Sequence, residues 1–334
     1  MHRTLYLLTL AALVGCGGSA SPTSDVSSSG EALARGEDHE EIESGDRGHP
    51  GWDRQSLLSA DRLLIESIAR RGPADGLRPF LAHDATYLAP RLAIATGEKE
   101  VEAALAAAFP AGAQVAQAWQ QFGGDVSADG LLGYTFGHGI QSTTQPDGTV
   151  LEQVVLSIAV WRHHGRHWLL ETYLWNLQRS EPGDPPPGFP LIDPGVSGTP
   201  RWGAPRRNAA EVLAADTAFA HLSVAQGYSI AFAAYVAPEG AQMASPIAWG
   251  GEAVAAAFAG WEPVETLDWA PALGRSTFSG DLGWSVGNAL YTLRNPDGSV
   301  AFQSPSKYLT VWARQADGHW KYILDGGNGR PLTP

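Results

Sequence analysis

The sequence predicts an α+β fold built from two consecutive copies of one unit. A hairpin pattern, in which two β-rich runs flank a turn, occurs at residues 158–176 and again at 308–328. Further landmarks repeat at nearly the same offset, such as PDGTV at 146–150 and PDGSV at 296–300. In each copy, apolar residues at helical spacing come first and strand-like runs follow. This order favours helices packed on one side of a strongly curved antiparallel sheet.

Length and composition allow two compact domains and argue against one class of partner. The chain has 334 residues, of which 44% are hydrophobic and 12 are tryptophan, enough for two separate cores. Its formal net charge is −13. A nucleic-acid partner would require a basic face on the protein, so we expect no such partner.

The first residues have the pattern of an export signal. A short basic start precedes an apolar run at 5–14, which is too short to span a bilayer. The run ends in LVGC at 13–16, which resembles the bacterial lipoprotein signal. The resemblance implies that 1–15 is a signal peptide and that Cys16 is lipidated and becomes the first mature residue. We therefore expect a protein of the bacterial cell envelope, held to the membrane at Cys16, and Gly17 favours the outer membrane.

Two segments have the composition of connecting chain. Residues 16–51 follow the expected anchor and contain eight acidic residues and two arginines, which predicts a flexible, self-repelling tether. Residues 179–208 contain eight prolines, a density that excludes a helix or a central strand. We expect a semi-rigid linker there, with Phe189, Ile192 and Trp202 positioned to pin it to a domain surface.

The first unit, 52–178, begins with an amphipathic helix. Leu57, Leu64 and Ile68 recur at helical spacing, and Asp61 falls on the same apolar face. The remaining predicted elements are a short helix at 78–83, a strand at 85–89, a helix at 97–109 and long strands at 114–126, 131–142, 150–162 and 167–178.

The second unit, 209–334, has the same order of elements. Its first helix carries Val212, Phe219 and Ser223 on one face, together with Asp216. The predicted helices are 211–226, 229–236 and 252–258, and the predicted strands are 264–278, 282–293, 300–313 and 319–325.

Several stretches of the second unit resemble a known superfamily. They are ADTAF at 215–219, YLTVW at 308–312, GHWK at 318–321 and DGGN at 325–328. These are similar to the NTF2-like superfamily, and within it to the SnoaL-like or DUF4440-type domains; the resemblance extends to both units. It implies two tandem cones, each with three N-terminal helices on a curved sheet and a pocket at the open end. Such cones include isomerases, dehydratases, hydrolases, carriers and association modules, so the fold does not define the function.

The resemblance also implies where a general base would stand. In the steroid-isomerase-like branch, an Asp directly precedes a Pro. The matching positions here are Ala89 before Pro90 and Ser245 before Pro246. Alanine cannot accept a proton, and an unactivated serine is a poor base. Both copies therefore lack the catalytic group of that branch.

Three other acidic residues are candidates for chemistry. Asp61 and Asp216 lie on apolar helix faces, where burial would raise the pKa of a carboxyl as acid–base catalysis requires. Acceptance of hydrogen bonds inside the core is the alternative role, and the presence of Asp in both copies favours it. Asp325 on the last strand is a similar case. Asp216 and Asp325 are thus the catalytic candidates.

Aromatic strand residues are candidates to line an apolar pocket in each cone. Polar residues beside them would orient a ligand. The second unit has the richer aromatic set and is the better candidate site. The predicted ligand-binding residues are Asp216, Trp269, Trp284, Tyr291, Tyr308 and Lys307 in the second unit, and Asp61, Trp119, Tyr134 and His138 in the first.

We expect neither a metal site nor a cofactor. His163, His164 and His167 surround a turn, but adjacent strand residues point to opposite faces and no acid lies in the turn. The sequence contains no P-loop and no dinucleotide-binding fingerprint.

Three functional hypotheses follow. The first is non-catalytic binding, either of a small apolar ligand in the cones or of a partner protein. The second is a hydrolase, isomerase or dehydratase that uses Asp216. The third is a structural role, in which the two sheets pack face to face as an intrachain pseudo-dimer. A closed cone filled with aromatic side chains would favour the structural role. An open cone with an accessible Asp216 would favour the enzymatic role.

Overall fold

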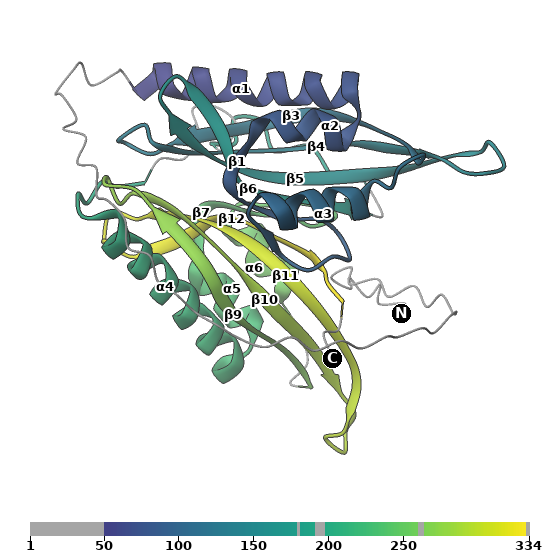
Figure 1. The fold of residues 1–334 in the computed structure, drawn as a ribbon. Helices are drawn as coiled ribbons and strands as arrows, with labels where there is room; N and C mark the ends of the chain where they lie inside the picture. Colours follow the sequence, from purple (N-terminus) through teal and green to yellow (C-terminus); the bar gives the residue numbers. More distant parts are fainter. Residues whose placement is uncertain (1–49, 179–180, 191–197, 260–263, 332–334) are drawn as a thin grey trace, which may run out of the picture.

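The computed structural model describes residues 50–178, 181–190, 198–259 and 264–331. The expected α+β architecture is confirmed, because each half of the chain forms one six-stranded sheet with helices packed on it. Figure 1 shows the two sheets stacked in the middle of the molecule, with α1 outside the first and α4 outside the second. The predicted lipidation residue, Cys16, lies outside the described residues.

The first unit has the sheet order β2-β1-β6-β5-β4-β3. Neighbouring strands are antiparallel except for one pair, because β1 runs parallel to β6. The elements are α1 (Pro50–Arg71), α2 (Pro73–Leu77), the 3₁₀ helix η1 (Arg78–Phe80), β1 (Leu81–Leu88), β2 (Ala95–Thr96), α3 (Glu98–Ala108), β3 (Gln114–Val126), β4 (Leu132–Thr144), β5 (Val150–His164) and β6 (His167–Gln178).

The second unit repeats this order as β8-β7-β12-β11-β10-β9, again with one parallel pair, between β7 and β12. The elements are α4 (Pro205–Gln226), α5 (Tyr228–Tyr235), β7 (Val236–Gln242), β8 (Ala248–Trp249), α6 (Gly251–Phe258), β9 (Glu265–Ser276), β10 (Leu282–Arg294), β11 (Val300–Arg314) and β12 (Trp320–Gly329).

The structure differs from the sequence-based expectation at several boundaries. Each sheet contains one parallel pair, because the last strand of the unit lies beside its first strand. A parallel pair cannot be joined by a hairpin and needs a long connection, which the intervening strands supply here. The third helix of each unit follows two strands and is not N-terminal to the sheet. A single 3₁₀ turn replaces the helix expected at 78–83. Helix α4 starts at Pro205, inside the expected linker, because the first turn of a helix tolerates a residue without an N–H.

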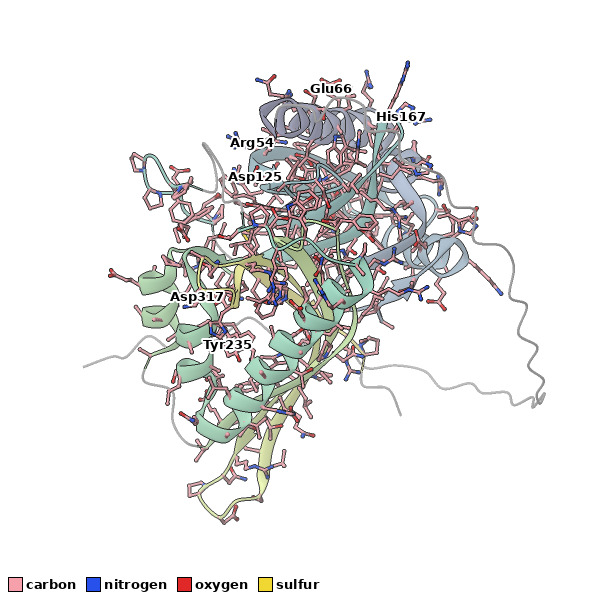
Figure 2. All side chains as sticks on the ribbon, turned by 90° about the vertical axis from the view of Figure 1, so that its left-hand side faces the viewer. Arg54, Glu66, Asp125, His167, Tyr235 and Asp317 are labelled. Carbon is pink, nitrogen blue, oxygen red and sulfur yellow. The ribbon has the colours of Figure 1, made fainter. Side chains whose placement is uncertain are left out.

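Each sheet buries one face against its own helices; we call this face the helix side. On α1, Leu57, Leu64 and Ile68 are buried there, as their spacing predicts. Arg54 fixes the start of the helix: its Nε donates to the Gly124 carbonyl on β3 at 2.8 Å. Figure 2 shows Arg54 next to Asp125, with 3.9 Å between Nε and Oδ1.

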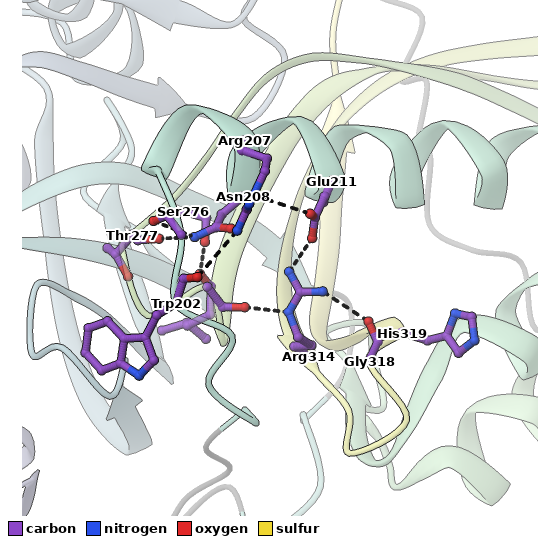
Figure 3. A network of polar contacts seen from close by, with 12 residues as sticks. Trp202, Arg207, Asn208, Glu211, Ser276, Thr277, Arg314, Gly318 and His319 are labelled. Carbon is purple, nitrogen blue, oxygen red and sulfur yellow. Dashed lines mark hydrogen bonds and ion pairs between the residues drawn. The ribbon is translucent and has the colours of Figure 1, made fainter.

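The start of α4 is held by a polar network around Arg314 (Figure 3). The buried guanidinium of Arg314 donates to the carbonyls of Gly280 at 2.7 Å and Gly318 at 3.1 Å. It also pairs with Glu211 on α4 at 2.5 Å and lies 4.4 Å from the ring centroid of Trp320. These contacts fix the helix to the two hairpins that follow β9 and β11.

The other face of each sheet, which we call the inter-sheet side, is buried against the other unit. A single apolar cluster contains strand residues from both sheets, and Phe189 of the linker joins it. Trp202, in contrast, is 62% exposed, and Ile192 lies outside the described residues. The strand residues of this cluster include Tyr134, Phe136, Leu156 and Ile158 from the first unit, and Trp284, Leu309, Val311 and Ile323 from the second.

Matched asparagines cross the inter-sheet side in both directions. Asn176 on β6 donates through Nδ2 to the Gly327 carbonyl at 2.8 Å. Asn328 on β12 donates through Nδ2 to the Trp175 carbonyl at 2.7 Å. Each asparagine therefore donates to the carbonyl of the residue directly before the other asparagine. Such exchange of equivalent contacts is the pattern of a two-fold interface.

A four-membered ion network also joins the units at one edge. Asp84 on β1 accepts from Arg162 at 2.6 Å and from Arg275 of the second unit at 2.8 Å. Arg275 also pairs with the buried carboxylate of Glu171 at 2.9 Å. The two arginines lower the pKa of Asp84 to about 2 against the opposing effect of its desolvation, which is the largest single influence on this carboxyl.

We predict that a charge placed between the sheets destabilises both units together. Ile158→Asp should lower the free energy of unfolding by more than about 3 kcal/mol, because it strands an unpaired carboxylate in an apolar cluster. Hydrogen exchange should rise on β11 of the other unit as well as on β5. Val150→Asp is the matched control on the same strand, where the side chain is 59% exposed and the change should be small. Exchange that rises in the first unit alone would contradict the prediction.

Candidate functional site

The carboxylate of Asp61 is held inside the first unit by side chains of the sheet. Thr135 on β4 donates to its Oδ1 at 2.8 Å and itself accepts from the indole of Trp161 at 2.9 Å. Gln121 on β3 donates to its Oδ2 at 2.5 Å. Burial raises the pKa of Asp61 from 3.8 to about 6, and these two hydrogen bonds only partly oppose the shift.

The matched carboxylate, Asp216, is closed off in the second unit. The indole of Trp269 donates to Oδ1 at 2.8 Å, and the hydroxyl of Tyr308 donates to Oδ2 at 2.9 Å. Ser285, which accepts from the indole of Trp312 at 2.8 Å, lies at the register position of Thr135. Burial raises the pKa of Asp216, and the residue is 0% exposed. Its arrangement is that of a satisfied core carboxylate.

Asp325 lies near Asp216 in the same interior. It accepts from Thr310 on β11 and from Gln242 on β7, the latter at 2.8 Å. Burial, with a smaller contribution from the charge of Asp216, raises the pKa of Asp325 to about 6. Both catalytic candidates from the sequence are therefore buried, and each is occupied by hydrogen bonds from its own sheet.

A pocket opens beside Asp61 in the first unit. A water-sized molecule can occupy only about 10 Å³ of it, about the space of one water. Most of the wall is apolar or aromatic, and Asp61 supplies the carboxylate. The lining residues are Asp61, Leu64, Ile65 and Ile68 of α1, Trp119, Gln120 and Gln121 of β3, Phe136 and Gly137 of β4, Ser157 of β5 and Tyr173 of β6.

One difference between the two copies accounts for this pocket. Gly137 pairs with Ser157 in the first sheet, and Gly287 pairs with Tyr308 in the second, so the serine and the tyrosine hold the same place. Tyr308 spans the interior and donates to its aspartate. Ser157 is too short to do so and instead hydrogen-bonds Tyr173 of β6, and only a small gap remains beside Asp61.

The other helix-side aromatics from the predicted set are divided between the two interiors. Trp119 lines the pocket, and its indole donates to Gln117 at 3.2 Å. Trp269 has the matching register and donates to Asp216 instead. Tyr291 is buried farther along the second sheet, where burial and the nearby Glu265 raise its pKa to about 12.

Four residues expected to line a cone lie on the inter-sheet side. Tyr134 and Trp284 belong to the apolar cluster between the sheets. His138 stacks on Phe122 there, with 4.5 Å between ring centroids, and burial lowers its pKa. Lys307 is adjacent to Tyr308 on β11 and so points to the other face.

The contacts of Lys307 confirm this placement. Its Nζ donates to the Ala89 carbonyl of the first unit at 2.7 Å and to the side chain of Asn328. Burial lowers its pKa to about 7, with a smaller contribution from Arg330. Lys307 therefore joins the two units and does not orient a ligand inside the second.

Among the described residues, no group of three or more His, Cys, Asp or Glu side chains is placed to hold a metal ion. His163 and His167 lie at the β5–β6 hairpin, and His163 contacts the ring of Trp168 at 4.8 Å between centroids. Figure 2 shows His167 at the outer edge of the first unit, far from the second. In the same part of the chain, no helix is both long and apolar enough to cross a membrane.

Sequence reasoning missed the polar residues that shape the pocket, Gln121, Thr135 and Ser157. All three are common residue types inside strand patterns, so none is conspicuous alone. Comparison of the two copies position by position would have found one of them. Ser157 in the first copy occupies the position that Tyr308 occupies in the second. A small side chain in place of a large one indicates a gap.

Several solved structures are similar to part of this chain. A ketosteroid isomerase-like protein from Erwinia carotovora atroseptica is 17% identical, with a TM-score of 0.32, over 38% of this chain and 98% of its own. An NTF2-like protein with a cystatin-like fold from Novosphingobium aromaticivorans is 21% identical, with a TM-score of 0.30, over 37% and 85%. An NTF2-like superfamily protein from Salmonella enterica serovar Typhimurium is 16% identical, with a TM-score of 0.31, over 39% and 95%. No protein-family model and no curated protein matches the chain.

We predict that Asp61 makes stability fall as pH rises from about 4 to about 6. Its pKa is about 6 in the folded state against an ordinary value of 3.8, so the folded state binds the proton more tightly. The resulting stabilisation is complete below pH 4 and is lost as pH rises through 6, by about 2–3 kcal/mol. Urea unfolding of wild type and Asp61→Asn across this range should show a loss that is larger in wild type, by about 2–3 kcal/mol. Asp325 is present in both proteins, so its own titration cancels, and parallel curves would contradict the assignment.

Proposed function

We propose that this chain is an envelope lipoprotein whose first unit binds a small apolar ligand without converting it. The second unit is its structural partner within one chain. The observation that carries the proposal is the apolar pocket with a small gap at Ser157, beside a buried carboxylate, at the register position that Tyr308 occupies in the other copy. The two copies thus have one scaffold and different interiors.

The lining supports a ligand that is small and mainly apolar. Leu64, Ile65 and Ile68 form one wall, and the ring of Trp119 forms another. Pockets for small molecules are usually about 300–1,000 Å³, with apolar walls and a few polar groups that fix orientation. The space here that a water-sized molecule can occupy is only about 10 Å³, far below that range, so a ligand enters only if the side chains around Ser157 move, and a compact molecule displaces fewer of them than a long acyl chain.

Binding is favoured over catalysis by the hydrogen bonds of the candidate acids. Asp216, which the enzymatic hypothesis required, is 0% exposed, and both of its oxygens accept hydrogen bonds. The position that precedes Pro90 is a buried alanine, Ala89, which cannot act as a base. The enzymatic alternative therefore lacks an accessible catalytic group in the second unit.

Proton transfer by Asp61 is a second candidate function, and one observation favours it. Its pKa of about 6, beside an open pocket, suits a general base near neutral pH. Against it, Thr135 and Gln121 hold both oxygens of Asp61. A single acid without an arranged partner group binds and orients a ligand more readily than it completes a reaction.

The role of the second unit is that of the other half of a dimer. Two-fold dimers exchange equivalent contacts, and Asn176 and Asn328 do this across the inter-sheet side. Fusion of the two copies replaces a concentration-dependent association with an intrachain one. The apolar face of the first sheet is then covered in every molecule.

The envelope location rests on the sequence that ends at Cys16. A diacylglycerol on this residue, with an amide-linked chain, supplies two lipid attachments, enough for stable anchoring. The acidic residues between 17 and 50 would hold the two units away from an anionic membrane surface. A ligand pocket is accessible from the periplasm or from the outside in this arrangement.

We predict that Ser157→Tyr empties the pocket of ligand. A tyrosine there should fill the gap and displace Tyr173, which hydrogen-bonds Ser157 in the wild type, so a cooperative thermal melt of the variant is required before its ligand content is compared. Protein purified from its own envelope should be extracted with solvent and the extract analysed by mass spectrometry. Wild type and Ser157→Ala, which keeps the space open, should carry the same small molecule, and Ser157→Tyr should carry none. An equal amount in all three proteins, or none in wild type, would refute the proposal.

We predict that Cys16→Ser releases the protein from the membrane. Without a thiol at this position no lipid can be attached, and the polar tether offers no other apolar anchor. Detergent phase partitioning should move the variant to the aqueous phase, while wild type stays with the membrane proteins. Full retention of the variant in the detergent phase would show that the anchor lies elsewhere.

A further inference from the structure

A basic and aromatic surface lies where the linker meets the second unit. It consists of Arg201, Trp202, Arg206, Arg207 and Phe278, which are all exposed, and we call it the linker surface. The whole chain has a formal net charge of −13. A local group of arginines beside two exposed rings, on a chain of the opposite charge, indicates a surface that another group covers.

The backbone of the linker surface is fixed by hydrogen bonds. The N–H of Arg201 donates to the Ser279 carbonyl at 2.7 Å, and the N–H of Gly203 donates to the Phe278 carbonyl at 2.8 Å. The exposed rings of Trp202 and Phe278 therefore lie on adjacent backbone segments. Figure 3 shows the indole of Trp202 turned away from the polar network that holds the start of α4. The backbone is held in place while both rings remain open to contact.

The positive charge of the linker surface is only partly balanced. Its arginines share one acid on α4, Glu211. A hydrogen bond from Arg314 is the main cause that lowers the pKa of Glu211, and the charges of Arg201 and Arg207 lower it further. Arg206 adds another positive charge in the first turn of α4, where the helix dipole is also positive. Several cations thus act around one carboxylate, so an anionic segment is the occupant that this surface fits.

The segment that precedes α1 starts on the same side of the molecule. Arg54 near the start of α1 bonds the carbonyl of Gly124 on β3. The turn after β3 reaches the second unit, where the N–H of Ser279 donates to Asp129 at 2.9 Å. Ser279 in turn accepts from Arg201 of the linker surface. Figure 1 shows the starts of α1 and α4 together on the left of the molecule.

We propose that the acidic segment 37–46 of this chain binds the linker surface. The segment contains six acidic residues and neither lysine nor arginine. Its carboxylates would pair with the exposed guanidinium groups, which suit carboxylates because of their planar arrangement of donors. Its one large apolar residue, Ile42, would cover the rings of Trp202 and Phe278.

The length of chain between the segment and α1 permits this contact. From Glu43 to Pro50 the chain spans up to about 25 Å when extended, enough to cross from α1 to the start of α4. Residues 17–36 stay outside the bound segment and remain as the connection to Cys16. Binding of the segment would shorten the free part of the tether and would shield the arginines from other anionic surfaces. Salt should release it, because the pairs are exposed.

The test follows the mobility of the segment in the full-length chain. Cys16→Ser removes the single cysteine, and Ser44→Cys then places one nitroxide label within the segment. Electron paramagnetic resonance at about 20 mM NaCl should show mainly a motionally restricted label. At about 1 M NaCl the label should become mobile, because the screening length falls from about 20 Å to about 3 Å.

Matched charge reversals assign the contact to the linker surface. Arg201→Glu combined with Arg206→Glu should make the label mobile at low salt, and both side chains are exposed, so folding should be preserved. Arg70→Glu combined with Arg71→Glu is the control. It reverses the same number of exposed arginines at the far end of α1 and should leave the label restricted.

Charge exchange and added lipid distinguish the possible occupants. Glu40→Lys combined with Glu41→Lys should make the label mobile, and its combination with the reversed arginine pair should restrict the label again in part. A label that is mobile in the parent protein at low salt, or that stays restricted after the arginine reversal, would overturn the proposal. Restriction that appears only when phosphatidylglycerol vesicles are added, and is lost with the arginine pair, would assign the surface to lipid headgroups and overturn it as well.

Discussion

The packing of the two sheets on one another is the constraint on which the rest of the structure depends. Each sheet has helices on one face, and the apolar residues on its other face are buried mainly by the second sheet, with Phe189 of the linker. The middle of β4, β5, β10 and β11 is therefore buried on both faces, with almost no alternation of exposed residues. Either unit alone would expose a large apolar face, which soluble proteins rarely do. We therefore expect the inter-sheet cluster to make the two units unfold as one cooperative structure.

Polar groups fix how the two apolar faces meet. An apolar cluster is non-directional and would tolerate a slip of one sheet over the other. Asn176 and Asn328 bond carbonyls of the opposite unit, and a slip would leave these groups unpaired in a buried region. Lys307 reaches the Ala89 carbonyl in the same region, at the cost of a lowered pKa. These polar contacts contribute less to the free energy with which the two sheets associate than to fixing one position of the first sheet relative to the second.

Much of the architecture could be predicted from the sequence, because the repeat and the hairpins are local patterns. The helix faces around Leu57 and Val212 followed from spacing alone. The faces of the strands did not. When both faces of a strand are apolar, the two-residue period places Lys307 opposite Tyr308 but does not tell which side is the interior. The parallel pair of β1 and β6 also depends on contacts between distant residues, which no local pattern contains.

Fusion of the two copies permits a difference that an identical dimer could not have. In a homodimer, a change that opens one interior opens both, and the stability lost is doubled. Here Tyr308 completes the hydrogen bonds of Asp216, and the second interior is closed and well packed. If the first interior is a binding site as proposed, it carries the costs of one: a gap at Ser157 and a carboxylate whose raised pKa reports its desolvation. Because the inter-sheet cluster joins the units, we expect the closed copy to stabilise the first one and so to allow a buried acid in the proposed binding unit.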